Sequence, residues 1–223
     1  MQILLDNILD ASRLDAIVET LEEEADSLFE DGKKTAGRTA KKVKSNLQAR
    51  PDAVEIKGAA AMVEKALLAN PVFAAAAFPK RIAKIMFSRY DPDMEYGAHV
   101  DDPIIADTRT DISFTLFLSD PDSYEGGELV LHKYDGDESI KLPAGSLVFY
   151  PSTSVHSVAR VLSGQRLAAV GWVESHVRLV EHREILFDLH NALANLADTE
   201  ENRLARISLL KAKYNLMRQW FDS

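Results

Sequence analysis

The chain contains no cysteine. This absence excludes disulfides and metal sites built from thiolates, and it fits a reducing compartment. No apolar run is long enough to span a bilayer, and the N-terminus lacks the basic and apolar regions of a signal peptide. We therefore expect a cytoplasmic protein that does not act in a membrane.

Positive charge is scarce. The 26 lysines and arginines are outnumbered by 35 aspartates and glutamates, which gives a formal net charge of −9. We do not expect broad electrostatic attraction to nucleic acid or to an anionic membrane, although a local basic patch stays open. With 223 residues, 46% of them hydrophobic, the chain can bury one substantial core that carries appendages.

The first part of the chain, residues 1–79, is predicted to be a helical and basic-loop segment that packs on the core. Apolar residues recur at three- and four-residue spacing over 10–31, which predicts an amphipathic helix. Asp10 or Ser12 can cap its start, and Gly32 ends it. A second helix is predicted over 57–69.

That second helix stops at Pro71, and the Ala-rich residues 72–79 carry no clear pattern. Between the two helices lies a basic stretch, for which we expect a solvated loop or strand edge. The alternative is a mobile rim that meets an acidic substrate or partner. The basic residues are Lys33, Lys34, Arg38, Lys41, Lys42, Lys44 and Arg50.

The middle part, residues 80–175, reads as short strands separated by turn residues. Eight such strands predict an α+β protein whose core is a double-stranded β-helix, a jelly-roll variant. The connection from Asp101 to Asp111 is expected to border the entrance. The predicted strands lie near 82–90, 95–100, 111–118, 127–132, 138–142, 146–150, 154–161 and 166–174.

The last part, residues 176–223, is predicted to be a helical extension with helices over 178–196 and 200–222. We expect these helices to pack on the barrel. A homodimer through them is the alternative, because Trp220 and Phe221 would be poor choices if left in water.

His99, Asp101 and His156 are the candidate metal ligands. His99 and Asp101 are two residues apart, so on an extended strand their side chains leave the same face. His156 lies in an alternating run that reads as another strand. Two imidazoles and one carboxylate leave coordination positions open, which suits non-haem Fe(II) enzymes that activate O₂. Either fragment alone is a weak signal, since such short motifs also occur by chance.

Arg166 opens an apolar strand that we expect to return beside the His156 strand. If its side chain points inward, it needs an anionic partner, because a buried unpaired charge is costly. Its planar fork matches a carboxylate. The alternative is a surface arginine at a hairpin end, near Ser163 and Gly164.

Together, His99-x-Asp101, His156 and Arg166 resemble the iron and 2-oxoglutarate signature of the Fe(II)/2-oxoglutarate-dependent dioxygenases. The wider chain resembles the PKHD-type hydroxylases of the prolyl 4-hydroxylase-like branch. This resemblance is strong over residues 80–175 and weaker towards both ends. It is carried by segments 87–90, 96–101, 116–121, 124–129, 141–145 and 150–152.

The resemblance implies Fe(II) and O₂, 2-oxoglutarate as cosubstrate, ascorbate as reductant, and release of succinate and CO₂. It implies that Arg166 pairs with the far carboxylate of 2-oxoglutarate and that Tyr90 hydrogen-bonds the cosubstrate. A packed core tyrosine is the equal alternative at Tyr90. Ser113, Thr115 and Phe117 share one strand face and are expected to line the cosubstrate pocket.

The resemblance points to hydroxylation of a prolyl or lysyl residue, while a free amino acid or siderophore-like compound stays open. A nucleobase demethylase is disfavoured, because Trp172 stands where those enzymes have a second arginine. Two other classes remain: a metal-binding protein without oxygenation, and a partner-binding module that uses the basic stretch. Asp102 is not expected to be a ligand. The other histidines are expected on the surface or in packing: His132, His176, His182 and His190.

Overall fold

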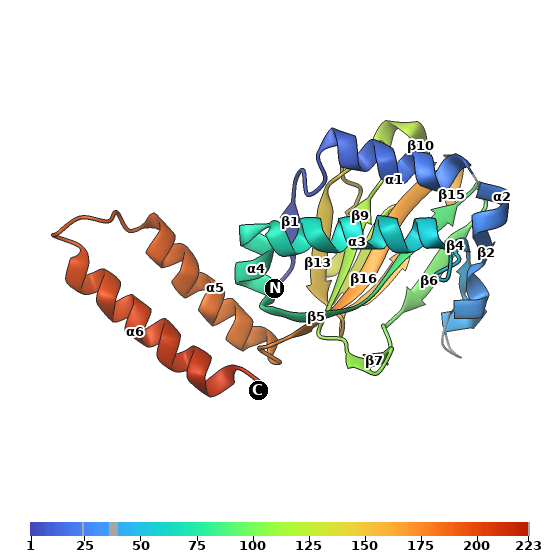
Figure 1. The fold of residues 1–223 in the computed structure, drawn as a ribbon. Helices are drawn as coiled ribbons and strands as arrows, with labels where there is room; N and C mark the ends of the chain where they lie inside the picture. Colours follow the sequence, from blue (N-terminus) through green and yellow to red (C-terminus); the bar gives the residue numbers. More distant parts are fainter. Residues whose placement is uncertain (24, 36–39, 223) are drawn as a thin grey trace.

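The computed structural model describes residues 1–23, 25–35 and 40–222, and it has two facing antiparallel sheets flanked by helices (Figure 1). The predicted α+β class and double-stranded β-helix are confirmed. The seven-stranded sheet has the order β1 (Ile3–Leu5), β13 (Leu147–Pro151), β9 (Ile112–Phe117), β16 (Arg166–Ser175), β5 (Pro79–Tyr90), β4 (Leu47–Ala49) and β2 (Phe29–Asp31).

The five-stranded sheet faces it. Its order is β12 (Gly136–Ile140), β11 (Leu129–Lys133), β14 (Val155–Val158), β6 (Glu95–His99) and β3 (Lys44–Ser45). Two small antiparallel pairs complete the strands: β7 (Ile104–Ile105) with β8 (Thr108–Arg109), and β10 (Tyr124–Gly126) with β15 (Val161–Gly164). The short 3-10 helices are η1 (Gly32–Thr35), η2 (Ala40–Lys42) and η3 (Pro121–Ser123).

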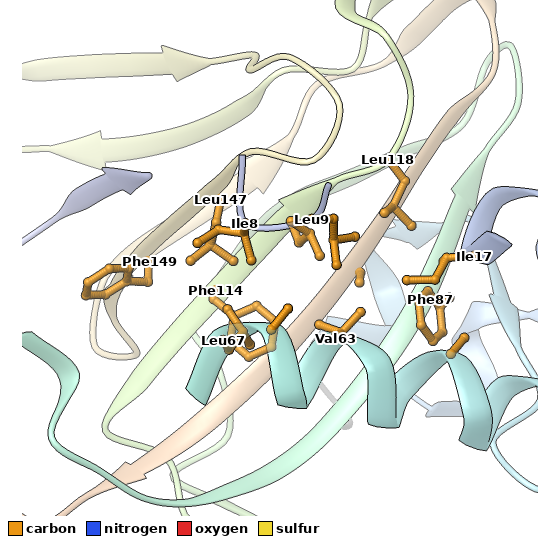
Figure 2. Packing of buried hydrophobic residues seen from close by; sticks show 14 of the residues in the cluster. Ile8, Leu9, Ile17, Val63, Leu67, Phe87, Phe114, Leu118, Leu147 and Phe149 are labelled. Carbon is orange, nitrogen blue, oxygen red and sulfur yellow. The ribbon is translucent and has the colours of Figure 1, made fainter. Parts of the chain in front are cut away.

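The main hydrophobic core lies between the outer face of the seven-stranded sheet and the N-terminal helices. Successive side chains of a strand point to opposite faces, so β9 sends Phe114 and Leu116 to this core and Ser113 and Thr115 into the barrel. Figure 2 shows Val63 and Leu67 of helix α3 (Val54–Ala69) against this face. One face of each central strand therefore stabilises the fold, and the other is available for a site.

The N-terminal helix is shorter than its sequence pattern predicts. It forms α1 (Ala11–Glu23), and the Asp10 carboxylate caps it by accepting a 2.9 Å hydrogen bond from the Arg13 N–H. The short α2 (Ala25–Leu28) follows, and residues 29–31 are strand β2. The prediction that the helix continues to residue 31 was therefore wrong. The backbone groups of residues 29–31 pair with strand β4 instead, with Phe29 opposite Ala49.

Helix α3 begins three residues before the predicted start and ends before Pro71, as predicted. Asn70 then caps α4 (Pro71–Ala77) by accepting a 2.9 Å hydrogen bond from the Phe73 N–H. No single helix in the described parts of the chain is long and apolar enough to cross a membrane. Helices α3 and α4 pass that test only as a pair, and they meet at an angle of 81°.

The C-terminal helices α5 (Val180–Asn195) and α6 (Arg203–Trp220) form a hairpin that projects away from the barrel (Figure 1). Its base packs on α4, where Trp220 and Phe221 stack on His182 and His176. No residue of α6 is fully buried. The expectation that both helices pack along the barrel is therefore correct only at the base of the hairpin.

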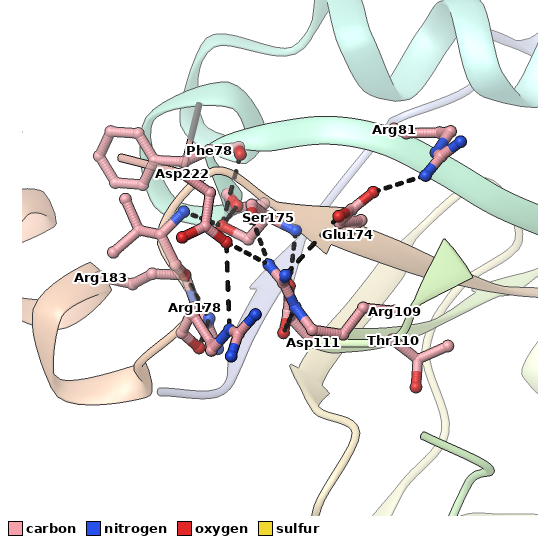
Figure 3. Close-up of polar contacts among 12 residues, drawn as sticks. Phe78, Arg81, Arg109, Thr110, Asp111, Glu174, Ser175, Arg178, Arg183 and Asp222 are labelled. Carbon is pink, nitrogen blue, oxygen red and sulfur yellow. Dashed lines mark hydrogen bonds and ion pairs between the residues drawn. The ribbon is translucent and has the colours of Figure 1, made fainter. Parts of the chain in front are cut away.

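Polar contacts fasten this base to the barrel (Figure 3). Arg109 donates three hydrogen bonds to Asp111, of 2.8, 3.0 and 2.9 Å, and one of 2.9 Å to the Ser175 carbonyl. The same guanidinium lies 3.1 Å from the Asp222 carboxylate, beyond α6. The hairpin is thereby linked to the strands that lead to the site.

Two strand predictions need correction. The run over 154–161 is two strands, β14 and β15, separated by residues 159 and 160. Strand β16 pairs with β5 and β9 in the seven-stranded sheet, so Arg166 does not lie beside the His156 strand. The two residues face each other across the barrel, which no local pattern could show.

Candidate active site

The structure brings the three predicted metal ligands together. His99 ends β6, Asp101 follows two residues later, and His156 lies opposite His99 on β14. Their potential ligand atoms all lie within 4.8 Å of one another. The centroids of the two imidazole rings are 4.2 Å apart, and Nε2 of His156 is 3.8 Å from Oδ2 of Asp101.

Backbone carbonyls orient both histidines. Nδ1 of His99 lies 2.9 Å from the Gly97 carbonyl oxygen, and Nδ1 of His156 lies 3.1 Å from that of Ser154. A carbonyl only accepts hydrogen bonds, so each Nδ1 carries a proton, and Nε2 is the atom of each ring that is available to a metal. Burial, followed by the charge of the neighbouring His156, lowers the pKa of His99 to about 4. At neutral pH, His99 is therefore an uncharged nitrogen donor.

The carboxylate is also held in place. The Ser113 hydroxyl donates a 2.5 Å hydrogen bond to Oδ2 of Asp101, and it is 2.8 Å from the Ser152 hydroxyl. Asp102 lines the cavity but is not in the ligand group. Two nitrogen donors and one oxygen donor on one side of an ion fit a non-haem Fe(II) centre with open positions.

The ligand group opens into a cavity of about 300 Å³ between the two sheets. Arg166 also lines it and is 1% exposed. None of its three guanidinium nitrogens has a hydrogen-bond partner within the described residues. The guanidinium carbon lies 5.2 Å from the centroid of the Tyr90 ring and 5.5 Å from that of the Phe117 ring. A buried cation without a partner calls for an anion inside the cavity.

Several hydroxyl groups surround the same space. Tyr90 is the cross-strand neighbour of Arg166, and it lines the cavity together with Thr115 and Tyr150. Burial raises the pKa of Tyr90 to about 12 and raises that of Tyr150 well above its ordinary value. Both phenols therefore keep their protons and can donate hydrogen bonds to an anion. Phe117, expected in the lining, packs on Arg166 instead.

One wall of the cavity was not predicted from the sequence. Lys44, Asn46 and Gln48 are buried and line the cavity. Lys44 lies on the edge strand β3, in agreement with the expected strand edge, but it is buried and not solvated. Strand β3 pairs with β6 and β4 pairs with β5, so this short segment joins the edges of both sheets. The signal was a polar residue at every second position, which is typical of a strand with one polar face. Arg38 lies outside the described residues.

Two further groups complete the surroundings of the metal ligands. The Tyr96 ring stacks on His99, with ring centroids 3.7 Å apart and an angle of 13° between the planes. Ile104 and Ile105 of the β7–β8 hairpin line the cavity, in agreement with the expected role of this connection. The other four histidines are not members of the ligand group.

Comparison with known proteins agrees with this geometry. Residues 85–174 match the 2OG-Fe(II) oxygenase superfamily. A PKHD-type hydroxylase of Parvibaculum lavamentivorans is 50% identical over 196 residues, which cover 86% of this chain and 87% of that protein. One of Crocosphaera subtropica is 44% identical over 225 residues and covers all of both chains. The chain belongs to the PKHD-type hydroxylases.

Solved structures show the same fold at lower identity. A prolyl-4-hydroxylase of Pseudomonas putida is 20% identical with a TM-score of 0.57, covering 78% of this chain and 92% of that one. A Trichoplax adhaerens prolyl hydroxylase was solved in complex with a hypoxia inducible factor oxygen degradation domain peptide fragment. It is 14% identical with a TM-score of 0.60, and the match covers 83% of this chain and 86% of that one. The protein is an oxygenase, and its family implies Fe(II), 2-oxoglutarate and O₂.

Proposed function

We propose that this protein hydroxylates an unactivated C–H bond, with conversion of 2-oxoglutarate to succinate and CO₂ and with ascorbate as reductant. His99, Asp101 and His156 hold Fe(II) on one side. Arg166 pairs with the far carboxylate of 2-oxoglutarate, while Tyr90 and Thr115 contact the cosubstrate. The bound iron and cosubstrate supply the oxygen chemistry, and the protein positions them and limits wasteful oxidation.

The observation that carries this proposal is the guanidinium of Arg166, buried without a partner in the cavity that also holds the ligand group. A protein that only stores or senses a metal would not need a buried cation there. A partner-binding module that uses the basic stretch would not need Lys44 to be buried. Both alternatives are therefore disfavoured.

The substrate is proposed to be a prolyl or lysyl residue of a protein, or a small molecule such as a free amino acid or siderophore-like compound. The peptide bound to the Trichoplax adhaerens enzyme supports the first class by analogy alone. A cytoplasmic location and no use of nucleic acid or membrane stay predictions from composition.

The first test is succinate formation by protein prepared without O₂ and then given Fe(II), ascorbate, 2-oxoglutarate and O₂. Slow turnover without substrate is expected for wild type, whereas Asp101→Ala and His156→Ala lose iron and activity. His132→Ala is the matched control, because its ring contacts Asp137 and Ser157 outside the ligand group. Full turnover by either ligand variant would refute the assignment.

If wild type forms no succinate, the next measurement is the visible charge-transfer band of 2-oxoglutarate on Fe(II) without O₂. A band would mean that the enzyme binds 2-oxoglutarate on Fe(II) but turns it over only when its substrate is present. No band would refute the proposed function.

A homodimer through the C-terminal helices also stays a prediction. The outer face of α6 exposes Leu204, Ile207 and Tyr214, whereas Trp220 and Phe221 pack within the chain. Sedimentation equilibrium at several concentrations tests it, and a monomer mass at all of them would exclude the dimer.

A further inference from the structure

Two lysines line the cavity in addition to Arg166. Lys44, 4% exposed, comes from β3 in the five-stranded sheet. Lys84, half-buried, comes from β5 in the seven-stranded sheet. The two lysines therefore approach one space from different sheets. Burying cationic groups is costly, so their position here calls for a reason beyond the fold.

The lysines lie close enough to affect each other. Burial, followed by the charge of Lys84, lowers the pKa of Lys44 to about 8. Burial also lowers the pKa of Lys84, and no hydrogen bond or ion pair joins its ammonium to another described residue. The Lys44 ammonium lies 5.0 Å from the centre of the Tyr96 ring, and Tyr96 stacks on His99. The positive charge is therefore gathered beside the ligand group.

Neutral polar groups accompany these charges. Both polar atoms of the Asn46 side chain and Nε1 of Trp172 are buried without a hydrogen-bond partner among the described residues. Both residues line the cavity, and Trp172 is the cross-strand neighbour of Lys84. The donors among these atoms are Nδ2 of Asn46 and Nε1 of Trp172, and buried donors are costly unless something accepts their hydrogen bonds.

We propose that Lys44 and Lys84, with Asn46 and Trp172, bind a carboxylate group of the substrate that is hydroxylated. This inference rests on the proposed function. In that function, the two carboxylates of 2-oxoglutarate are taken up by the metal and by Arg166. The ammonium of Lys84 and the donors of Asn46 and Trp172 are then left for a further anion, in a cavity that Lys44 makes more positive. An acid fits them, whereas the ammonium of a lysyl side chain would be repelled by two like charges.

The carboxylate can come from a free acid or from the C-terminus of a peptide. The test therefore compares free amino acids, N-acetylproline, and a short proline-containing peptide, the latter two with a free and with an amidated carboxyl group. Each compound is added without O₂ to the complex of wild type with Fe(II) and 2-oxoglutarate, and the shift of the charge-transfer band is measured. At least one acid is expected to bind and then to accelerate succinate formation in O₂, and its amide is expected to bind at least about 10-fold more weakly.

Lys44→Met and Lys84→Met are expected to raise the apparent KM for that acid about 10-fold or more. The KM for that acid is expected to rise more than the KM for 2-oxoglutarate, because the far carboxylate of 2-oxoglutarate is assigned to Arg166. Lys65→Met is the control, because Lys65 is exposed on α3, outside the cavity lining. Thermal unfolding of each variant shows that it is folded.

Any one of three results would overturn the inference. The first is that the amides bind as well as the acids, and the second is that no acid in the panel binds at millimolar concentration. The third is that the lysine variants raise the KM for 2-oxoglutarate instead of the KM for the acid. These outcomes are separate from failure of the proposed function, which would appear as wild type without a charge-transfer band and without succinate.

Discussion

Ser113 and Asp101 join the two sheets at the candidate metal centre. Asp101 follows β6 of the five-stranded sheet, and Ser113 lies on β9 of the seven-stranded sheet, yet the hydroxyl donates a 2.5 Å hydrogen bond to the carboxylate. The contact holds the Asp101 carboxylate in the group that it forms with the two histidines. The barrel thus positions a candidate ligand that the local sequence leaves in a loop.

The first prediction concerns this hydrogen bond. Ser113→Ala is expected to keep the fold and to weaken Fe(II) binding about 10- to 100-fold, because partners that orient a ligand have effects of this size. Anaerobic metal titration measures it. Ser152→Ala should have a smaller effect, since the Ser152 hydroxyl bonds Ser113. Equal affinity of Ser113→Ala and wild type would contradict the positioning role.

The second prediction separates binding from stability at Arg166. Arg166→Met is expected to weaken the binding of 2-oxoglutarate about 10-fold or more. Without ligand, the variant should be as stable as wild type or more stable, because it removes a buried cation without a partner. Thermal unfolding with Fe(II), with and without 2-oxoglutarate, checks both effects. Arg166→Lys should bind at an intermediate level, since it keeps the charge and loses the fork.

The third prediction is a matched pair of glycine substitutions. A Cβ on Gly171 would lie 2.5 Å from Cζ of Phe114 and 2.6 Å from the Lys84 carbonyl oxygen. Gly171→Ala should therefore lower the free energy of unfolding by about 1–3 kcal/mol. In α3, a Cβ on Gly58 meets nothing within 4 Å, so Gly58→Ala should raise stability by about 0.5–1 kcal/mol. Urea unfolding measures both, and shifts of the same sign would count against the packing argument.

The fourth prediction concerns the attachment of the C-terminal hairpin. Arg109→Met leaves the buried Asp111 carboxylate with the Ser175 N–H, 2.8 Å away, and removes the ion pair to Asp222. We expect a loss of about 1–3 kcal/mol of stability and faster hydrogen exchange at the base of the hairpin. Arg203→Met, which breaks an exposed pair with Glu200, should cost about 0–1 kcal/mol. Equal losses of stability in the two variants would show that the contacts of Figure 3 contribute little to the free energy of unfolding.

The fifth prediction concerns pH. The pKa of His99 is about 4 in the folded protein and 6.5 ordinarily, so the unfolded chain binds more protons between these values. The metal-free protein should therefore lose stability as pH falls from about 6.5 towards 4. His99→Gln should lose less in this window, because it has no such proton to bind. Urea unfolding at a series of pH values measures it, and parallel curves would contradict the argument.

Sequence alone determined the local features of the site. The two-residue spacing of His99 and Asp101, the strand around His156 and the turn residues between strands are short-range patterns, and the structure realises them. Helix and strand ends were less accurate, as at residues 29–31, because an edge strand provides partners that the helical pattern does not reveal.

Tertiary structure decided which strands meet. Arg166 was placed beside the His156 strand, although β16 lies in the opposite sheet. Lys44 was expected in a solvated loop or at a strand edge, and it lies on the edge strand β3 with its side chain buried. Strand order depends on long-range pairing and barrel closure, whereas side-chain alternation specifies only which residues share a face. The sequence therefore determined the chemistry of the candidate metal ligands, and the fold determined the cationic wall of the cavity around them.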